Sequence, residues 1–197
     1  MKDTFKNVLC LTLITVVAGF GLGYVYEITK GPIATMEENT RTAAYRSVFP
    51  EADSFEELDK DLVSSKAPEG NGCDVDSAVI AKDPAGAGIG YVINVTTHEG
   101  YGGDITISAG IDNSGCVKGI EILKISETAG LGMKAKEKKF TDQFKDKTVK
   151  QFAYTKNGAS SDFEIDALSG ATITTKAVTD AVNTALAFFG SIGGAAQ

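Results

Sequence analysis

The chain has 197 residues, with 19 Lys and Arg against 26 Asp and Glu, so its net charge at neutral pH is −7. This length suits one folded domain with an additional segment, and 43% apolar residues are enough for a sizeable core. The acidity argues against nucleic acid as a partner, because its binding needs a basic surface. We attribute the acidity to solubility.

The first expected element is a membrane-spanning helix over residues 8–26, which contain no charged side chain. These 19 residues would extend about 28 Å, close to the hydrocarbon thickness of a bilayer. Lys2 and Lys6 precede the stretch, and Tyr24 and Tyr26 end it as interfacial aromatic residues would. A cleaved signal peptide is the alternative, but the run is longer than a signal core and no Ala-x-Ala site follows it. We expect a retained anchor.

The positive-inside rule places residues 1–7 in the cytoplasm and everything after about residue 28 outside. Gly19 and Gly23 have the spacing that lets a second helix approach closely, although this spacing is common in membrane helices and a partner stays open. The predicted organisation has four parts: a cytoplasmic start and membrane helix over 1–28, a juxtamembrane helix and linker over 29–76, a folded domain over 77–190, and a flexible tail over 191–197.

Beyond the anchor, the pattern predicts an α+β fold with a mainly antiparallel sheet and flanking helices. A helix is expected over 37–48, ended by Pro50, and residues 54–65 are charged without a clear period. Residues 66–76, rich in Gly, Pro and Asp, predict a loop. Short connections favour antiparallel pairing of the strands that follow. Strands are predicted over 78–81, 90–97, 104–111, 117–125 and 147–154, and helices over 134–144 and 175–189.

Small and hydroxylic residues stand directly before the last helix, in the segment Ser169, Gly170, Ala171, Thr172, Ile173 and Thr174. A helix start of this kind presents unpaired backbone N–H groups and the positive end of the helix dipole, which together can hold a phosphate. The alternative is an ordinary N-cap, in which Thr172 or Thr174 satisfies helix N–H groups.

Two other segments could carry chemistry. Residues 100–105 hold three glycines around Tyr101, so their backbone could press against a flat ligand, or they could simply connect two strands. Residues 126–134 join a strand to a helix, where binding residues often lie. The simpler alternative there is a helix start capped by Glu127 or Thr128.

These three segments resemble elements of the FMN-binding domain family. Residues 169–174 are similar to its flavinylation sequence, in which the last Thr carries FMN through a phosphoester bond, and Asp166 matches an acidic residue upstream. Residues 100–103 are similar to its Gly-Tyr-Gly-Gly element. Residues 127–132 are similar to its Glu-Thr-Pro-Gly-Leu-Gly element, with Ala129 in place of Pro.

The resemblance implies covalent FMN as the cofactor, with Thr174 as the attachment residue. Backbone N–H groups of 171–174 and the hydroxyls of Ser169 and Thr172 would hold the phosphate, and the two loops would pack on the isoalloxazine ring. The flavin would do the redox chemistry, so no general base or nucleophile is expected in turnover. The implied cofactor-binding residues are Thr174, Ser169, Gly170, Ala171, Thr172, Glu127, Thr128, Gly130, Leu131, Gly132, Tyr101, Gly102 and Gly103.

Within this family, the length and single anchor are most similar to the G subunits of Rnf-type electron-transport complexes, and related to the C subunits of sodium-pumping NADH:quinone reductases. The resemblance implies an electron relay in a complex that couples ferredoxin oxidation and NAD⁺ reduction to Na⁺ or H⁺ movement. The implied partners are the other membrane subunits and, during maturation, a flavin transferase that uses FAD and Mg²⁺. The implied location is the plasma membrane, with the flavin domain outside. A stand-alone extracytoplasmic flavin reductase and a flavin-free, membrane-tethered interaction module are the alternatives.

The remaining reactive residues predict no metal site. His98 is the single histidine, which excludes multi-histidine metal sites and histidine triads, and we expect it to be solvated. Cys10, Cys73 and Cys116 lack the Cys-x-x-Cys spacing of iron–sulfur and zinc sites. A disulfide between Cys73 and Cys116 stays open if the domain is extracytoplasmic.

Overall fold

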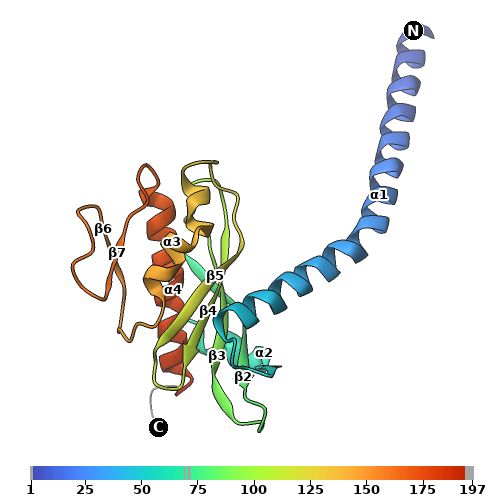
Figure 1. Ribbon diagram of the computed structural model, residues 1–197. Coiled ribbons are helices and arrows are strands. Elements are labelled where there is room, and N and C mark those ends of the chain that lie inside the picture. The colour runs from blue at the N-terminus through green and yellow to red at the C-terminus, as the bar shows by residue number, and fades with distance from the viewer. Residues whose placement is uncertain (1, 69, 71, 194–197) are drawn as a thin grey trace. The chain divides into compact units, whose positions relative to one another are not determined.

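The computed structural model describes residues 2–68, 70 and 72–193 (Figure 1). The chain forms two compact units, residues 1–40 and residues 41–197, and each is described by itself. Of the expected flexible tail, residues 194–197 lie outside the described residues.

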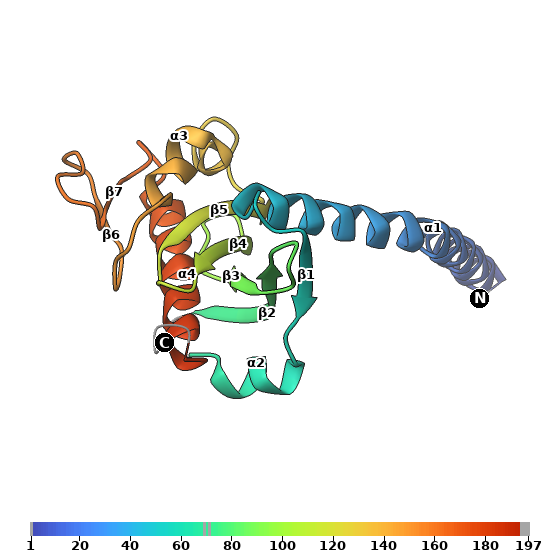
Figure 2. The same cartoon turned by 60° about the horizontal axis from the view of Figure 1, so that its bottom comes forward.

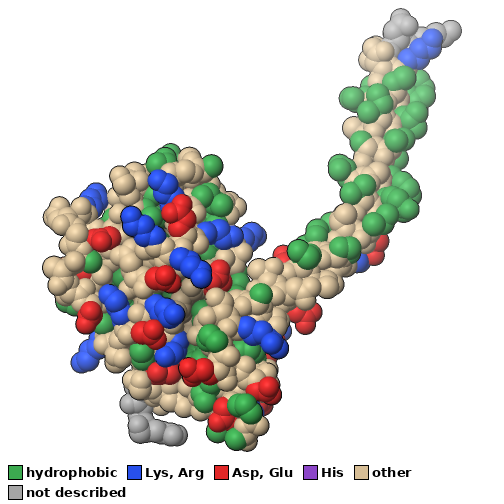
Figure 3. All heavy atoms as spheres, in the orientation of Figure 1, with side chains coloured by type: hydrophobic (Ala, Val, Ile, Leu, Met, Phe, Trp, Pro, Cys, Tyr) green, Lys and Arg blue, Asp and Glu red, His purple; other side chains and the backbone are tan. Residues whose placement is uncertain are grey.

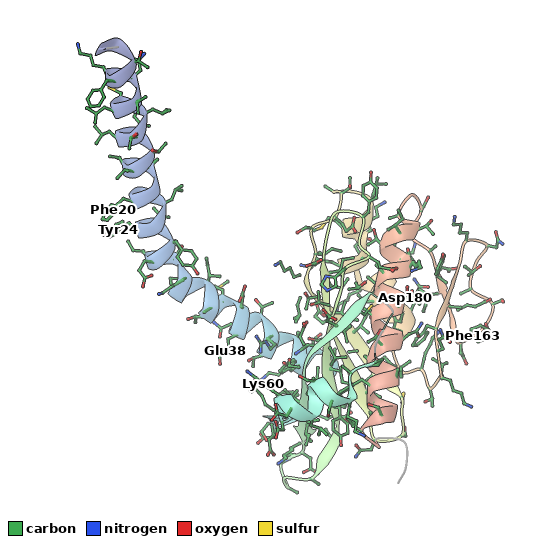
Figure 4. The ribbon with its side chains drawn as sticks, turned by 180° about the vertical axis from the view of Figure 1, so that it is seen from behind. Phe20, Tyr24, Glu38, Lys60, Phe163 and Asp180 are labelled. Carbon is green, nitrogen blue, oxygen red and sulfur yellow. The ribbon has the colours of Figure 1, made fainter. Side chains whose placement is uncertain are left out.

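The first unit consists of most of helix α1 (Lys2–Val48). Apolar side chains cover this part of α1 and are exposed, Phe20 to 79% (Figure 3), and Phe20 and Tyr24 project from the ribbon in Figure 4. Within the described residues, α1 is the one helix with the length and apolar composition to cross a membrane. The helix expected over 37–48 is the last part of α1, which continues through Pro32.

The second unit is built on a five-stranded sheet in the order β1-β2-β3-β4-β5, with every neighbouring pair antiparallel. This confirms the α+β class and the mainly antiparallel sheet. The strands are β1 (Ser54–Glu57), β2 (Cys73–Lys82), β3 (Gly88–Thr97), β4 (Ile105–Asp112) and β5 (Val117–Lys124). The other elements are α2 (Lys60–Lys66), η1 (Gly132–Lys136), α3 (Lys138–Thr141), η2 (Asp142–Phe144), the parallel pair β6 (Ala153–Thr155) and β7 (Glu164–Asp166), and α4 (Thr172–Ser191).

Helix α4 lies along one face of the sheet (Figure 2) and packs against β2, β3 and β4. The side chains of β3 alternate, as a strand with two covered faces requires. Ile93 and Val95 belong to the core cluster beneath α4, whereas Val92 belongs to a second cluster with Tyr45 and Phe49 from the end of α1 and the turn after it. The sheet is therefore buried on both sides.

The structure corrects the prediction for residues 54–76. Residues 54–57 form the edge strand β1, and β2 begins at Cys73, inside the expected loop. Asp74 and Asp76 disfavour a strand locally. Asp74 nevertheless pairs with Thr96 of β3, and Asp76, at a bulge in β2, accepts a hydrogen bond from the Thr96 hydroxyl over 2.6 Å. Tertiary pairing therefore outweighs the local preference of this segment.

The strand expected over 147–154 is found only at its end, where residues 153 and 154 belong to β6. Lys147 forms only an isolated bridge with Val117, and the backbone of Phe152 is bound by a side chain of α4. Asn183 Oδ1 accepts from Phe152 N over 2.7 Å, and Asn183 Nδ2 donates to Phe152 O over 3.0 Å. The helix expected over 134–144 is divided into η1, α3 and η2.

A disulfide between Cys73 and Cys116 is excluded by the strand register. Cys73 lies opposite Thr97, which pairs with Ile105 at the start of β4. Cys116 accepts through its carbonyl from Asp112 N, at the other end of β4. A strand of this length spans roughly 24 Å, far beyond the Cα separation that a disulfide can bridge. Both cysteines are free.

Candidate functional site

The three segments that resemble family elements meet at one end of the sheet. Because Thr97 pairs with Ile105 and Thr106 pairs with Lys124, the end of β3, the start of β4 and the end of β5 lie together. The β3–β4 connection and the segment after β5 therefore leave the sheet at the same end. Both segments and the first turn of α4 contribute to one pocket.

This flavin-loop pocket, as we call it, has a volume of about 570 Å³. Its lining residues are Tyr101, Glu127, Thr128, Leu131, Gly132, Gly170, Ala171, Thr172, Ile173 and Thr174. All but one of them are site residues expected from the resemblance. Ile173 was missed, although its place between Thr172 and Thr174 at a helix start was a usable signal. Four expected residues flank the lining without joining it: Ser169, Gly102, Gly103 and Gly130.

The first turn of α4 is not capped by a threonine side chain, which excludes the alternative of an N-cap by Thr172 or Thr174. Ala171 is the N-cap residue and makes no side-chain cap. The first backbone bond of the helix is Thr175 N to Ala171 O, 3.0 Å long. Within the described residues, the N–H groups of Thr172, Ile173 and Thr174 have no backbone or side-chain acceptor. They are the unpaired donors of a 20-residue helix.

At this helix start the side chain of Thr175, and not that of Thr174, forms hydrogen bonds with the backbone. Its hydroxyl accepts from Leu168 N and donates to Ala171 O, each over 3.0 Å. Thr174 is only 1% exposed and lines the pocket, and its Oγ1 makes no hydrogen bond within the described part of the chain. The hydroxyl of this buried residue therefore faces the pocket with its hydrogen-bonding capacity free.

Glu127 also lines the pocket and is only 9% exposed. Its Oε1 accepts from Tyr101 N over 2.7 Å, which joins the segment after β5 to the glycine loop. Glu127 therefore joins two loops, and this contact stands in place of the helix cap considered as the alternative. A Cβ on Gly102 would stand 2.1 Å from Ser126 O, so only glycine allows the two segments to approach this closely.

The chemistry of the lining suits a flavin phosphate. Among the described lining residues there is no Lys, Arg or His, so a phosphate would be held by backbone N–H groups at the positive end of α4. Tyr101, Leu131 and Ile173 expose 71%, 43% and 51% of their surface around the pocket, as apolar surface for a flat ring would be. The residues present therefore fit FMN.

Asp166 does not contribute to the pocket lining. Its carboxylate accepts from Ala159 N, and its backbone N–H donates to Gln143 Oε1 over 2.6 Å. These bonds hold the loop between β6 and β7, from which Phe163 projects beyond α4 (Figure 4). Asp166 therefore stabilises the loop between β6 and β7 and does not contact the pocket.

His98 is exposed, as expected, but it is held by two carboxylates. Its Nδ1 lies 2.9 Å from Asp104 and its Nε2 lies 3.0 Å from Asp74. The hydrogen bond to Asp104 and, to a smaller extent, the one to Asp74 raise the pKa of His98 to about 9. Next to it, Glu99 forms an ion pair with Lys176 of α4. No group of three potential metal ligands occurs in the described part of the chain.

Comparison with known proteins agrees with this geometry. Residues 100–187 match the FMN-binding domain family. The chain is 34% identical to the G subunit of the Na⁺-translocating ferredoxin:NAD⁺ oxidoreductase complex of Acetobacterium woodii, over 92% of this chain and 89% of that protein. It is 30% identical to the G subunit of an ion-translocating oxidoreductase complex of Methanosarcina acetivorans, over 94% of each chain.

Solved structures share the fold. The C subunit of the Na⁺-translocating NADH-quinone reductase from Parabacteroides distasonis matches with a TM-score of 0.55 and 20% identity, over 74% of this chain and 79% of that one. NqrC of Shewanella oneidensis matches with a TM-score of 0.50 and 18% identity, over 73% and 70%. At these identities the likeness concerns the fold alone. The identity to the G subunits goes further: the chain belongs to the family of G subunits of ion-translocating oxidoreductase complexes and contains an FMN-binding domain.

Proposed function

We propose that this chain is the membrane-anchored flavoprotein subunit of an Rnf-type ferredoxin:NAD⁺ oxidoreductase, with FMN esterified to Thr174. The observation that carries the proposal is the hydroxyl of the buried residue Thr174, which has no partner in the described residues and lies in a pocket beside three free N–H groups. A phosphoester at this atom would place the phosphate at the positive end of α4.

FMN bound there would accept electrons and pass them on, and the protein would position it and tune its potential. The N–H groups of residues 172–174 would bind the phosphate. The loops of residues 100–103 and 127–132 would lie against the ring and exclude water, and their backbone donors would favour the reduced, anionic flavin.

The partners in this proposal are the other membrane subunits of the complex and a flavin transferase, which supplies the FMN from FAD with Mg²⁺. The coupled ion is Na⁺ or H⁺. The A. woodii relative bears a Na⁺-translocating name and a Clostridium ljungdahlii relative, 30% identical, a proton-translocating one. The names of these relatives therefore support an ion-translocating ferredoxin:NAD⁺ oxidoreductase complex, and they differ in the ion that is coupled.

The experiment is in-gel fluorescence of the denatured protein under ultraviolet light, after co-expression with the transferase. Fluorescence in the wild type that is lost in Thr174→Ala would establish a covalent flavin at this residue. Thr179→Ala is the matched control, because it removes a buried hydroxyl from the same helix that only donates to Thr175 O over 2.8 Å. It should keep the fluorescence.

The other outcomes separate the alternatives. A non-fluorescent wild type, with the transferase shown to be active on another substrate protein, would contradict covalent FMN and favour the flavin-free interaction module. Flavin-dependent reduction of an added acceptor by the isolated protein, without the other subunits, would favour a stand-alone reductase.

The side of the membrane is a separate part of the proposal. With α1 retained as the anchor, the flavin domain lies outside the cytoplasm, as the lysines before residue 8 favour. Protease added to intact, right-side-out cells should then remove the domain. Complete protection of the domain would contradict this topology.

A further inference from the structure

Two oxygen atoms without hydrogen-bond partners in the described residues lie next to Gly132. An ideal Cβ on Gly132 would lie 2.7 Å from Thr174 Oγ1 and 2.8 Å from Glu127 Oε2, so these two oxygens are no more than 5.5 Å apart. A methyl group there would collide with both. Thr174 and Glu127 are 1% and 9% exposed, so each is enclosed by protein and both line the pocket.

The carboxylate of Glu127 is oriented by its other oxygen. Oε1 accepts from Tyr101 N, whereas Oε2 has no hydrogen bond within the described residues. No Lys, Arg or His belongs to the described lining, so no cation of the lining neutralises the carboxylate. The two oxygens are not hydrogen-bonded to each other in the described structure. A fixed carboxylate oxygen with free acceptor capacity, within 5.5 Å of a free hydroxyl, can act as its general base through one water or after a small approach when the flavin binds.

We propose that Glu127 accepts the proton of Thr174 when the flavin is attached, an inference that rests on the function proposed above. Thr174 Oγ1 attacks the phosphorus atom of FAD that bears the riboflavin. The new O–P bond forms, the P–O bond to AMP breaks, and AMP leaves with that electron pair. The hydroxyl proton passes to Glu127 Oε2, and nothing is oxidised or reduced.

Charge balance favours this assignment. An ionised Glu127 would repel the phosphodiester charge that arrives beside it, since like charges at this distance disfavour each other. Proton transfer from Thr174 neutralises the carboxylate in the same step. The three N–H groups at the start of α4 then face a single negative charge, that of the phosphodiester.

The competing role for Glu127 is purely structural: it would only hold Tyr101 N. Glu127→Gln separates the two roles, because the amide oxygen still accepts from Tyr101 N but the amide cannot take up the proton. Glu99→Gln is the matched control. It removes a carboxylate two residues from Tyr101 that pairs with Lys176, and Lys176 keeps Asp180 at 2.9 Å.

The experiment follows the initial rate of flavin attachment to the purified full-length protein in detergent, with flavin transferase, FAD and Mg²⁺, by the mass of the intact chain. Loss of a general base slows proton transfer by about 10²–10⁴-fold, and we expect a decrease of roughly this size for Glu127→Gln. Glu99→Gln should react at the wild-type rate. Attachment to Glu127→Gln at the wild-type rate overturns the proposal.

A second readout is the ratio of the wild-type rate to the Glu127→Gln rate across pH, because ionisations of the transferase cancel in this ratio. The ratio should fall on acidification, because a protonated carboxyl group cannot accept the hydroxyl proton. A ratio that is independent of pH, with the Tyr101 contact kept, assigns Glu127 a structural role and overturns the proposal.

Glu127→Asp covers the case in which the amide variant does not fold. It keeps a carboxylate and should be slow but show the wild-type pH dependence, and a rate without that dependence overturns the proposal. Failure of the proposed function looks different: the wild type and Thr174→Ala would then be equally unlabelled.

Discussion

Helices α1 and α4 are both rich in apolar residues, but α4 buries them in the core of the domain, whereas most of those in α1 are exposed. From Val8 to Val25 the large apolar side chains of α1 are exposed on every side. In α4 the buried residues recur every three or four positions, and threonines at those positions bond back to carbonyls of the helix. A continuous apolar run therefore predicts a membrane-spanning helix, whereas a periodic one predicts a helix on a core.

The largest expected effect tests this contrast by removing one apolar side chain from each helix. Phe188 is fully buried in α4, and Phe188→Ala should lower the free energy of unfolding of the domain by about 3–5 kcal/mol. Val17→Ala in α1 should leave it unchanged, because Val17 is exposed and belongs to the other unit. Denaturant unfolding in detergent, followed by tyrosine fluorescence, measures both. Equal effects would contradict the contrast.

A charge in α1 should act on membrane insertion and leave the fold intact. Leu13 lies within the uncharged run and is exposed. Leu13→Lys should disfavour insertion by about 3 kcal/mol, which moves protein from the membrane fraction to the soluble fraction. Leu13→Ala, which adds no charge, should stay in the membrane. Cell fractionation and immunoblotting measure the distribution, and an unchanged distribution for Leu13→Lys would count against α1 as the anchor.

Within the domain, glycines can be compared by what surrounds them. Gly132→Ala places a methyl group against Thr174 Oγ1 and Glu127, so it should destabilise the domain by about 1–3 kcal/mol and suppress flavin attachment. Gly190→Ala, near the end of α4, meets nothing within 4 Å and should do neither. Thermal unfolding and in-gel flavin fluorescence test the pair. Normal flavin attachment in Gly132→Ala would show that attachment does not need the free space between Gly132, Thr174 Oγ1 and Glu127.

The smallest effect is expected at His98. Its pKa is raised from 6.5 to about 9 by Asp104 and Asp74, so folding favours the protonated form. The resulting stabilisation is complete below pH 6.5 and is lost as the pH rises through about 9. His98→Gln should remove this part of the pH dependence, measured by thermal unfolding from about pH 6 to about pH 10. The same slope in both proteins would mean that the two carboxylates do not act on His98.

The sequence by itself determined the elements whose burial follows a regular period. The strand expected over 90–97 and the helix expected over 175–189 were found with small shifts, as β3 and α4. The membrane-spanning helix was predicted from the uncharged run of α1 alone, because the length and polarity of a segment decide membrane insertion without reference to the rest of the chain. The resemblance supplied all the lining residues of the pocket except Ile173.

Only the tertiary structure decided the elements that depend on distant partners. Residues 73–77 became a strand through pairing with β3. Of the strand expected over 147–154, only residues 153 and 154 lie in a strand, because Asn183 binds the backbone of Phe152 just before them. The approach of Glu127 to Thr174 was also not readable, since these residues are separated along the chain and meet only because β5 and α4 direct their ends to one pocket. Hydrogen bonds between distant segments are set by topology, whereas the pattern of a single segment records only its own burial.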